Sequence, residues 1–155
     1  MILYLDASAL VKRYVAELGS KEVGNAISNS DLVGTALISR PEVSAALAEA
    51  VRVEALTQEE ASTCLHVFRE EWPDLIRVQV TEMAVTRADT LAWEHGLRGY
   101  DAVHLAAASL WQDALGESVT FSTFDRQLWE KAKRVGLSLH PIDLPALLET
   151  WKATR

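Results

Sequence analysis

Four acidic residues stand where helices are predicted to begin. They are Asp6 between the apolar stretches "ILYL" and "ASALV", Glu42 in "ISRPEVSAALAEAV", Asp101 in "GLRGYDAVHLAAASL" and Asp125 in "VTFSTFDRQLWEKAKRVGL". Carboxylates that are brought together repel one another unless a cation lies among them. Oxygen ligands without cysteine or histidine suit Mg²⁺ or Mn²⁺ rather than zinc. Two such ions in an acidic pocket can hydrolyse a phosphodiester, because one activates a water and the other stabilises the leaving oxygen.

Each acid also has a purely structural explanation. Aspartate is among the best N-cap residues, and an acidic side chain in a first turn interacts favourably with the helix dipole. For any one of the four residues taken singly, this explanation is the better one. The four together favour a shared site, because first turns that follow parallel strands converge on one edge of a sheet.

The elements that would position these acids alternate along the chain. Alternating strands and helices predict an α/β fold, here a three-layer sandwich with a mostly parallel central sheet of about five strands flanked by helices. Ligands bind such folds at the carboxyl ends of the strands, which is where Asp6 stands. The segments between the strands have helical spacing, and the one that ends at Gly96 has a favourable stop residue. The apolar runs short enough to be strands are Ile2–Leu5, Leu32–Ala36, Ile76–Val80, Ser118–Phe121 and Ser138–Pro141.

The composition indicates one globular domain over residues 1–155. Hydrophobic residues make up 49% of the chain, which argues against disorder. The lone Cys64 excludes a disulfide framework and fits a reducing compartment. The sequence shows no signal peptide and no apolar run near the ~20 residues that a membrane span needs. We therefore expect a cytoplasmic protein with no membrane partner.

The charge balance leaves the class of partner open. A net charge of −7 disfavours a general nucleic-acid binder, because phosphate contacts require lysine and arginine. The segment 126–134 nevertheless carries four basic residues against one acidic residue. A local basic face can therefore coexist with an acidic total.

The motifs around the four acids together resemble a known family. In order and spacing, "YLDASALVK", "RPEVSAAL", "RGYDAVHLAAA" and "FSTFDRQLWEKAKRVGL" are similar to the motifs of a PIN domain, and more narrowly of a VapC-type toxin ribonuclease from a toxin–antitoxin pair. The resemblance covers nearly the whole chain. It implies a PIN-like fold and a metal-dependent endoribonuclease, which hydrolyses RNA phosphodiester bonds with a metal-activated water held in an acidic pocket.

The resemblance also implies roles for the acids and a set of partners. Asp6 and Asp101 would be the principal ligands of Mg²⁺, for which Mn²⁺ can substitute. Glu42 and Asp125 would support them. The partners implied are an RNA substrate, a cognate antitoxin protein, and further copies of the chain in a homodimer or higher oligomer.

Two hydroxyl residues complete the implied site, and two positions depart from the family pattern. Ser8 and Thr123 match the hydroxyl positions that line the site in the family. Pro41 precedes the glutamate, and Phe124 takes a position often filled by a small residue. Access beside Asp125 is therefore expected to differ from that of other members.

Basic residues and a histidine near the motifs each have two explanations. Lys12, Arg98 and Arg126 are candidates for contacts with substrate phosphates, but solvated charges or a pair with a carboxylate explain them equally well. His104 lies three residues after Asp101, on the same helical face. A packed or hydrogen-bonded histidine explains it better than a general base, since a metal-activated water needs no imidazole.

Three other functions fit part of the pattern. A haloacid-dehalogenase-like enzyme, a metal-dependent phosphatase of another α/β fold, needs a second aspartate where this chain has Ser8. A receiver domain needs an acidic pair at the first strand, but Leu5 precedes Asp6. A PIN-like RNA- or protein-binding module without catalysis would be favoured by the loss of one of the four acids, and none is lost. The RNA target, the antitoxin's identity and the number of ions stay open.

Overall fold

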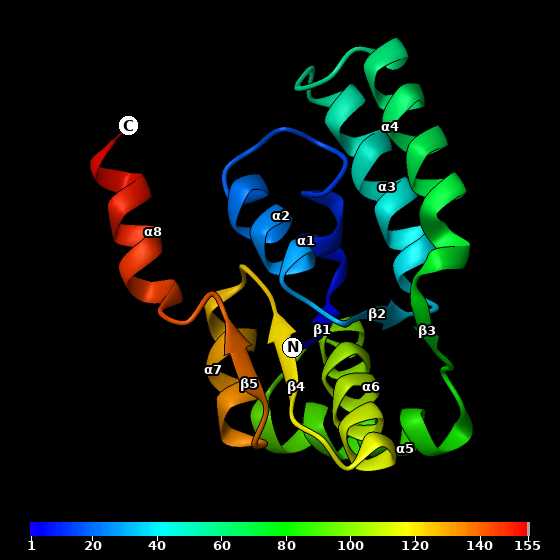
Figure 1. The fold of residues 1–155 in the computed structure, drawn as a ribbon, viewed down its shortest axis with the longest axis vertical. Coiled ribbons are helices and arrows are strands. Elements are labelled where there is room, and N and C mark those ends of the chain that lie inside the picture. Colours follow the sequence, from blue (N-terminus) through cyan, green and yellow to red (C-terminus); the bar gives the residue numbers. More distant parts are fainter. Residues whose placement is uncertain (155) are drawn as a thin grey trace.

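The central sheet has the strands and the direction that the sequence predicts. In the computed structural model, which describes residues 1–154, five strands pair in parallel in the order β3-β2-β1-β4-β5 (Figure 1). All the predicted strands are confirmed, with small differences at their ends, and so is the α/β fold class. The strands are β1 (Ile2–Leu5), β2 (Leu32–Ala36), β3 (Ile76–Val78), β4 (Val119–Ser122) and β5 (Ser138–His140).

Helices connect the strands, and local signals set several of their ends. Thr57 and Glu60 form a reciprocal capping box where one helix starts. Gly96 ends another with a left-handed φ of 65°, as the sequence predicts. None of the helices in residues 1–154 is both long and apolar enough to cross a membrane. The helices are α1 (Ala7–Val11), α2 (Ser20–Ser28), α3 (Ser39–Arg52), α4 (Gln58–Glu71), the short 3₁₀ helix η1 (Trp72–Asp74), α5 (Glu82–His95), α6 (Gly99–Leu115), α7 (Arg126–Arg134) and α8 (Leu144–Ala153).

Strand β1 separates two apolar cores, because its side chains alternate between the faces of the sheet. Leu3 and Leu5 pack with residues of α1 to α4, including the fully buried Phe68. Tyr4 packs on the opposite face with residues of α5 to α7, and there it contacts the core around Phe121. The arrangement has helices on both faces of one sheet, which confirms the predicted three layers (Figure 1).

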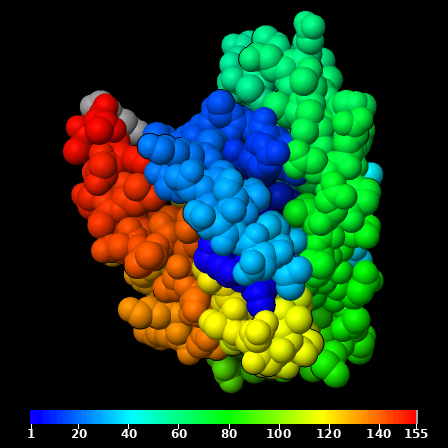
Figure 2. Space-filling model, in the orientation of Figure 1, coloured from blue at the N-terminus to red at the C-terminus, as the bar shows by residue number. Residues whose placement is uncertain are grey.

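The last helix lies at one edge of the molecule. Figure 2 shows α8, in red, at the edge opposite the green segments that contain α4 and α5. Trp151 of α8 stacks on Phe124, with the ring centroids 5.9 Å apart. This contact holds α8 beside the end of β4. It also explains how the fold accommodates the large residue next to Asp125.

The strand order makes a branch point at the ends of β1 and β4. The chain passes from β1 to β2 on one side, whereas β4 pairs with the other side of β1. The helices that follow these two strands, α1 and α7, belong to opposite cores. The backbone N–H of Asp6 donates to the carbonyl oxygen of Ser122 at 3.2 Å and joins the two strand ends. In open α/β sheets, ligands bind at the crevice that forms at such a point.

Gly34 in β2 lies directly under a helix. A Cβ atom at this position would lie 2.8 Å from the indole of Trp111 in α6 and 3.0 Å from the carbonyl oxygen of Ile76. We expect Gly34→Ala to lower the free energy of unfolding by about 1–3 kcal/mol, the usual cost of overpacking a core. Urea denaturation measures this change.

Gly24→Ala in α2 is the matched control for this substitution. No heavy atom lies within 4 Å of the Cβ that it would add. Alanine favours a helix over glycine by ~1 kcal/mol, so this variant should gain stability. An unchanged stability of Gly34→Ala would mean that α6 yields to the added methyl group without cost.

Candidate active site

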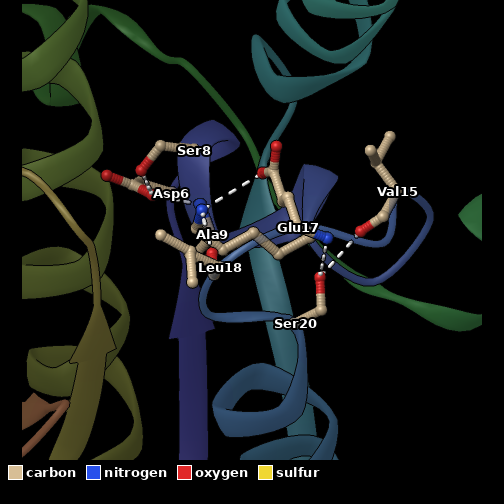
Figure 3. A network of polar contacts seen from close by, with 8 residues as sticks. Asp6, Ser8, Ala9, Val15, Glu17, Leu18 and Ser20 are labelled. Carbon is tan, nitrogen blue, oxygen red and sulfur yellow. Dashed lines mark hydrogen bonds and ion pairs between the residues drawn. The ribbon is translucent and has the colours of Figure 1, made fainter. Parts of the chain in front are cut away.

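Asp6 lies at the end of β1 and is the N-cap of α1. Its Oδ1 atom accepts hydrogen bonds from the backbone N–H of Ala9 at 2.8 Å and from the hydroxyl of Ser8 at 2.7 Å (Figure 3). The residue is only 4% exposed. The capping role that the sequence indicates is therefore confirmed. Both bonds use the same carboxylate oxygen, so capping leaves the second oxygen for other contacts.

Burial raises the pKa of the Asp6 carboxyl group above its usual value, because a carboxylate loses its hydration in the interior. Several neighbours oppose this rise in pKa, led by His104 and followed by the hydroxyls of Thr123 and Ser8 and the N–H of Ala9. They do not cancel it. The ionised form of Asp6 therefore carries a free-energy cost in the folded chain, which a nearby cation would relieve.

Glu42 lies in the first turn of α3 and contacts a buried histidine. Its Oε1 atom is 2.7 Å from Nε2 of His104 in α6. The Nδ1 atom of His104 lies 2.7 Å from the hydroxyl of Tyr4 in β1. With 2% exposure and both ring nitrogens engaged, His104 is a packed and hydrogen-bonded histidine. The preference for this explanation over a general base is confirmed.

Asp101 and Asp125 are joined by one arginine. Asp125 is the N-cap of α7, and its Oδ1 atom accepts from the backbone N–H of Leu128 at 2.9 Å. The Nε atom of Arg98 donates to Oδ2 of Asp101 at 3.3 Å, and its Nη2 atom lies 3.6 Å from Oδ2 of Asp125. Of the explanations that the sequence leaves open for Arg98, pairing with carboxylates is thus the one that the structure shows.

Thr123 links the two parts of the site. Its hydroxyl lowers the pKa of Asp6 and accepts a hydrogen bond from the backbone N–H of Asp125 at 3.2 Å. Asp101 and His104 are one turn apart on α6, and His104 reaches the glutamate of α3. The four acids therefore surround the carboxyl ends of β1 and β4 and are connected through Thr123, Arg98 and His104.

The acids do not form a preorganised metal-binding site. In the part of the chain that the structure describes, no three His, Cys, Asp or Glu side chains are close enough together to hold a metal ion. The guanidinium of Arg98 lies between Asp101 and Asp125 instead. The site residues thus share one region of the fold, whereas their roles as ligands stay predictions.

Two of the candidates for phosphate binding make local contacts. The Nζ atom of Lys12 donates to the carbonyl oxygen of Leu18 at 2.7 Å and to the carboxylate of Glu17 at 3.1 Å. These bonds hold the loop between α1 and α2. Arg126, the first residue of α7, lies 3.4 Å from Glu130 in an exposed ion pair. For both residues, contact with a substrate stays a prediction.

Tyr4 is the residue of this region that the sequence analysis did not single out. It is fully buried, and its ring stacks on Phe121 at a centroid distance of 5.3 Å. A signal was available, because Tyr4 precedes Asp6 by two residues, and alternate residues of a strand point to the same face. A hydroxyl within an aliphatic strand also needs a buried partner. That need predicts a polar side chain in the covering helix, which is His104.

Sequence comparison finds relatives along nearly the whole chain. "Ribonuclease VapC45" from Mycobacterium tuberculosis is 34% identical over 144 residues, which cover 92% of this chain and 97% of that protein. "Ribonuclease VapC3" from Pyrobaculum aerophilum is 33% identical over 133 residues, which cover 84% of this chain and 95% of that protein. No protein-family model matches the chain.

Structure comparison finds the same fold in solved structures. One is a chain of the "Toxin-antitoxin complex from Klebsiella pneumoniae", with a TM-score of 0.58 and 17% identity over 81% of this chain and 87% of that chain. At this level of identity, the likeness concerns the fold alone. It agrees with the parallel sheet and its two helical layers.

Proposed function

We propose, because the chain belongs to the VapC family of ribonucleases, that it is an endoribonuclease that hydrolyses RNA phosphodiester bonds and acts as the toxin of a toxin–antitoxin pair. One observation carries the proposal. Asp6 and Asp125 lie at the ends of neighbouring strands and are linked through Thr123, at the crevice where α/β folds bind ligands. Asp101 and Glu42 flank this pair.

A divalent cation suits the donors of this site. Carboxylate and hydroxyl oxygens are the ligands that Mg²⁺ and Mn²⁺ prefer. The guanidinium of Arg98, lying between two of the carboxylates, supports this fit, since a positive charge is already favourable there. We propose Mg²⁺, with Mn²⁺ able to substitute, held principally by Asp6 and Asp101 and supported by Glu42 and Asp125.

The side chains of the chain itself prepare the place for this ion. When bound, a divalent cation polarises the scissile phosphate and promotes ionisation of a water molecule. The N–H of Ala9 and the hydroxyl of Ser8 hold one oxygen of Asp6, and the N–H of Leu128 holds one oxygen of Asp125. Each aspartate is thereby kept in one orientation, with its second oxygen outside the cap. Capping and metal binding are thus compatible roles for the same residue.

Basic residues at the rim would orient the RNA. The side chain of Arg98 is 83% exposed, so it can leave the two carboxylates and contact a phosphate when a cation takes its place. A guanidinium suits this role because its planar donors bind phosphate oxygens in pairs. Lys12 follows α1, with its Nζ atom 4.9 Å from the centroid of the Phe124 ring, and Arg126 is the first residue of α7. We propose both as further phosphate contacts.

RNA cleavage is the test of the proposed function. The purified chain is incubated with a pool of labelled single-stranded RNA of random sequence in Mg²⁺, in Mn²⁺ or in EDTA. We expect internal cleavage with either ion and none in EDTA. An equal rate in EDTA would overturn the metal dependence. RNA that is bound but uncut with both ions would indicate a binding module without catalysis.

We also propose a cytoplasmic location, a cognate antitoxin protein as partner, and assembly into a homodimer or higher oligomer. The fold shared with a chain of a toxin–antitoxin complex supports the antitoxin. Large exposed side chains support a protein interface, since aromatic residues and methionine are enriched in interfaces. Among the aromatic residues and methionines, the most exposed are Trp93 at 89%, with Met83 and Tyr100 at 67% each.

Co-expression with the product of the neighbouring small reading frame tests the partner. We expect the two proteins to purify together, RNA cleavage to be suppressed in the complex, and light scattering of the free chain to give at least the mass of a dimer. A strictly monomeric chain that binds no product of its own operon would contradict both proposals.

A further inference from the structure

A series of hydrogen bonds runs from the core to the candidate active site. The hydroxyl of Tyr4 lies 2.7 Å from Nδ1 of His104, and Nε2 of His104 lies 2.7 Å from Oε1 of Glu42. Tyr4 and His104 are 0% and 2% exposed, whereas the side chain of Glu42 is 27% exposed. The three residues come from β1, α6 and α3, so the series crosses all layers of the fold.

The direction of these hydrogen bonds follows from their environment. Burial and the nearby charges of Asp6 and Glu42 raise the pKa of the Tyr4 phenol well above its usual value, so the phenol keeps its proton. The phenol can therefore donate to Nδ1 of His104, 2.7 Å away. When Nδ1 accepts this bond, the imidazole proton is on Nε2, which lies 2.7 Å from the carboxylate of Glu42 and can donate to it.

We infer that Tyr4 and His104 are positioning residues that fix the carboxylate of Glu42 in the orientation in which it supports the bound cation. This inference rests on the proposed function. A glutamate side chain has three rotatable bonds and loses up to about 2 kcal/mol of conformational entropy when it is ordered. In residues 1–154, His104 is the hydrogen-bond partner that orders it. One oxygen is thereby held, and the other stays available to the site.

His104 acts here through Glu42 and not on the RNA. Its ring is buried, and both of its nitrogens are engaged, so no face is open to a substrate. Residues that hold a metal ligand in place usually change metal affinity about 10–100-fold when they are replaced. The size of the effect on affinity, together with its dependence on Glu42, therefore separates positioning from simple packing.

Two substitutions of His104 separate its two hydrogen bonds. The amide nitrogen of glutamine can take the place of Nε2, so His104→Gln keeps a donor for Glu42. Asparagine is one bond shorter and reaches the place of Nδ1, so His104→Asn keeps a partner for Tyr4 and loses the bond to Glu42. Tyr4→Phe removes the hydroxyl partner of Nδ1 and leaves the aromatic packing intact, so it serves even if a variant of His104 does not fold.

Mn²⁺ binding in the absence of RNA is the main measurement, by electron paramagnetic resonance of the free ion. We expect His104→Asn to weaken Mn²⁺ binding about 10–100-fold, Tyr4→Phe to weaken it by about 10-fold, and His104→Gln to stay close to wild type. Melting in EDTA verifies that each variant is folded. Equal losses for glutamine and asparagine, or an unchanged affinity in Tyr4→Phe, would overturn the inference.

A double-mutant cycle with Glu42→Gln tests whether the effect passes through Glu42. If it does, His104→Asn causes no further loss of Mn²⁺ affinity in the Glu42→Gln background. The same loss in both backgrounds would mean that His104 only packs the core.

A measurement without metal separates this inference from the proposed function. The carboxyl carbon of Glu42 is followed by nuclear magnetic resonance in EDTA. Its signal should move in His104→Asn and stay near the wild-type position in His104→Gln. If the wild-type chain binds no Mn²⁺, the proposed metal site fails. The Glu42 signal still decides whether His104 orients the carboxylate, because an equal signal in all variants would overturn that as well.

Discussion

Asp101→Asn is expected to reduce RNA cleavage in Mg²⁺ or Mn²⁺ by roughly 10²–10³-fold or more, the loss typical when one electrostatic contact with the transition state is removed. The substitution removes a negative charge from the proposed ligand set and keeps the size of the side chain. Asp101 does not cap its helix, and its hydrogen-bond partner in residues 1–154 is the exposed Arg98. The variant should therefore fold as wild type does, so that a loss of RNA cleavage reports on the active site and not on stability. Initial rates of cleavage of a labelled RNA give the ratio.

Asp113→Asn is the matched control, because Asp113 is also an aspartate of α6 that pairs with an arginine. Its Oδ2 atom lies 2.8 Å from Arg87, on the part of the helix away from the strand ends. This variant should cleave RNA at nearly the wild-type rate. Cleavage by Asp101→Asn at the rate of Asp113→Asn would show that Asp101 takes no part in the reaction.

The sequence predicts the frame of this site well, because the frame depends on local patterns. Short apolar runs separated by helical spacing give the parallel sheet; Asp6 directly follows β1, and Asp125 caps the helix that follows β4. The carboxyl ends of parallel strands meet at one edge, so the convergence of these acids follows from their position in the chain. Glu42 lies in the first turn of α3, which follows β2, whereas Asp101 lies in the first turn of α6, which follows α5 and not a strand.

The contacts between the acids could not be predicted, because they join residues far apart in the sequence. The bond between Tyr4 and His104 spans 100 residues, and that between Glu42 and His104 spans 62. The spacing of each motif fixes which face of a helix a side chain occupies, but not which residue of another element it meets. Spacing along the chain likewise indicates no partner for Arg98 beyond its own helix, and the structure adds Asp125.

Lys12 shows the same limit in a loop. The sequence places it in the first helix near Asp6, where a phosphate contact is plausible chemistry. The structure directs its ammonium group to Glu17 and to the carbonyl oxygen of Leu18. The loop that carries these two residues has no periodic pattern, so its path cannot be derived from composition.

Asp6→Asn is expected to stabilise the metal-free chain while it abolishes cleavage. Asp6 is the acid whose charge opposes folding most clearly, because burial raises the pKa of its carboxyl group despite the surrounding hydrogen bonds. Asn caps a helix nearly as well as Asp, so the substitution removes the charge and keeps the bond to Ala9. We expect a gain of about 0.5–2 kcal/mol in the free energy of unfolding at neutral pH in EDTA, the usual range when a costly functional residue is replaced.

The pH dependence of this gain identifies its cause. Because the pKa of Asp6 is raised in the folded chain, wild type has no penalty below the unfolded pKa of about 3.9, where the group is protonated in both states. The penalty grows as the pH rises through the folded pKa, and it is constant above that value. The difference in unfolding free energy between Asp6→Asn and wild type should follow the same course, small in acid and largest at neutral pH.

Asp143→Asn separates the charge from the cap. Asp143 is the N-cap of α8, accepts from the backbone N–H of Ala146 at 3.1 Å and is exposed. Asp143→Asn makes the same exchange of an aspartate cap for an asparagine cap, but at a solvent-exposed position. The difference in unfolding free energy between Asp143→Asn and wild type should therefore change little between acid and neutral pH. Mn²⁺ should then stabilise wild type and Asp143→Asn equally, and Asp6→Asn much less. A gain in Asp6→Asn that is independent of pH, with an undiminished response to Mn²⁺, would mean that the Asp6 charge neither opposes folding nor binds the ion.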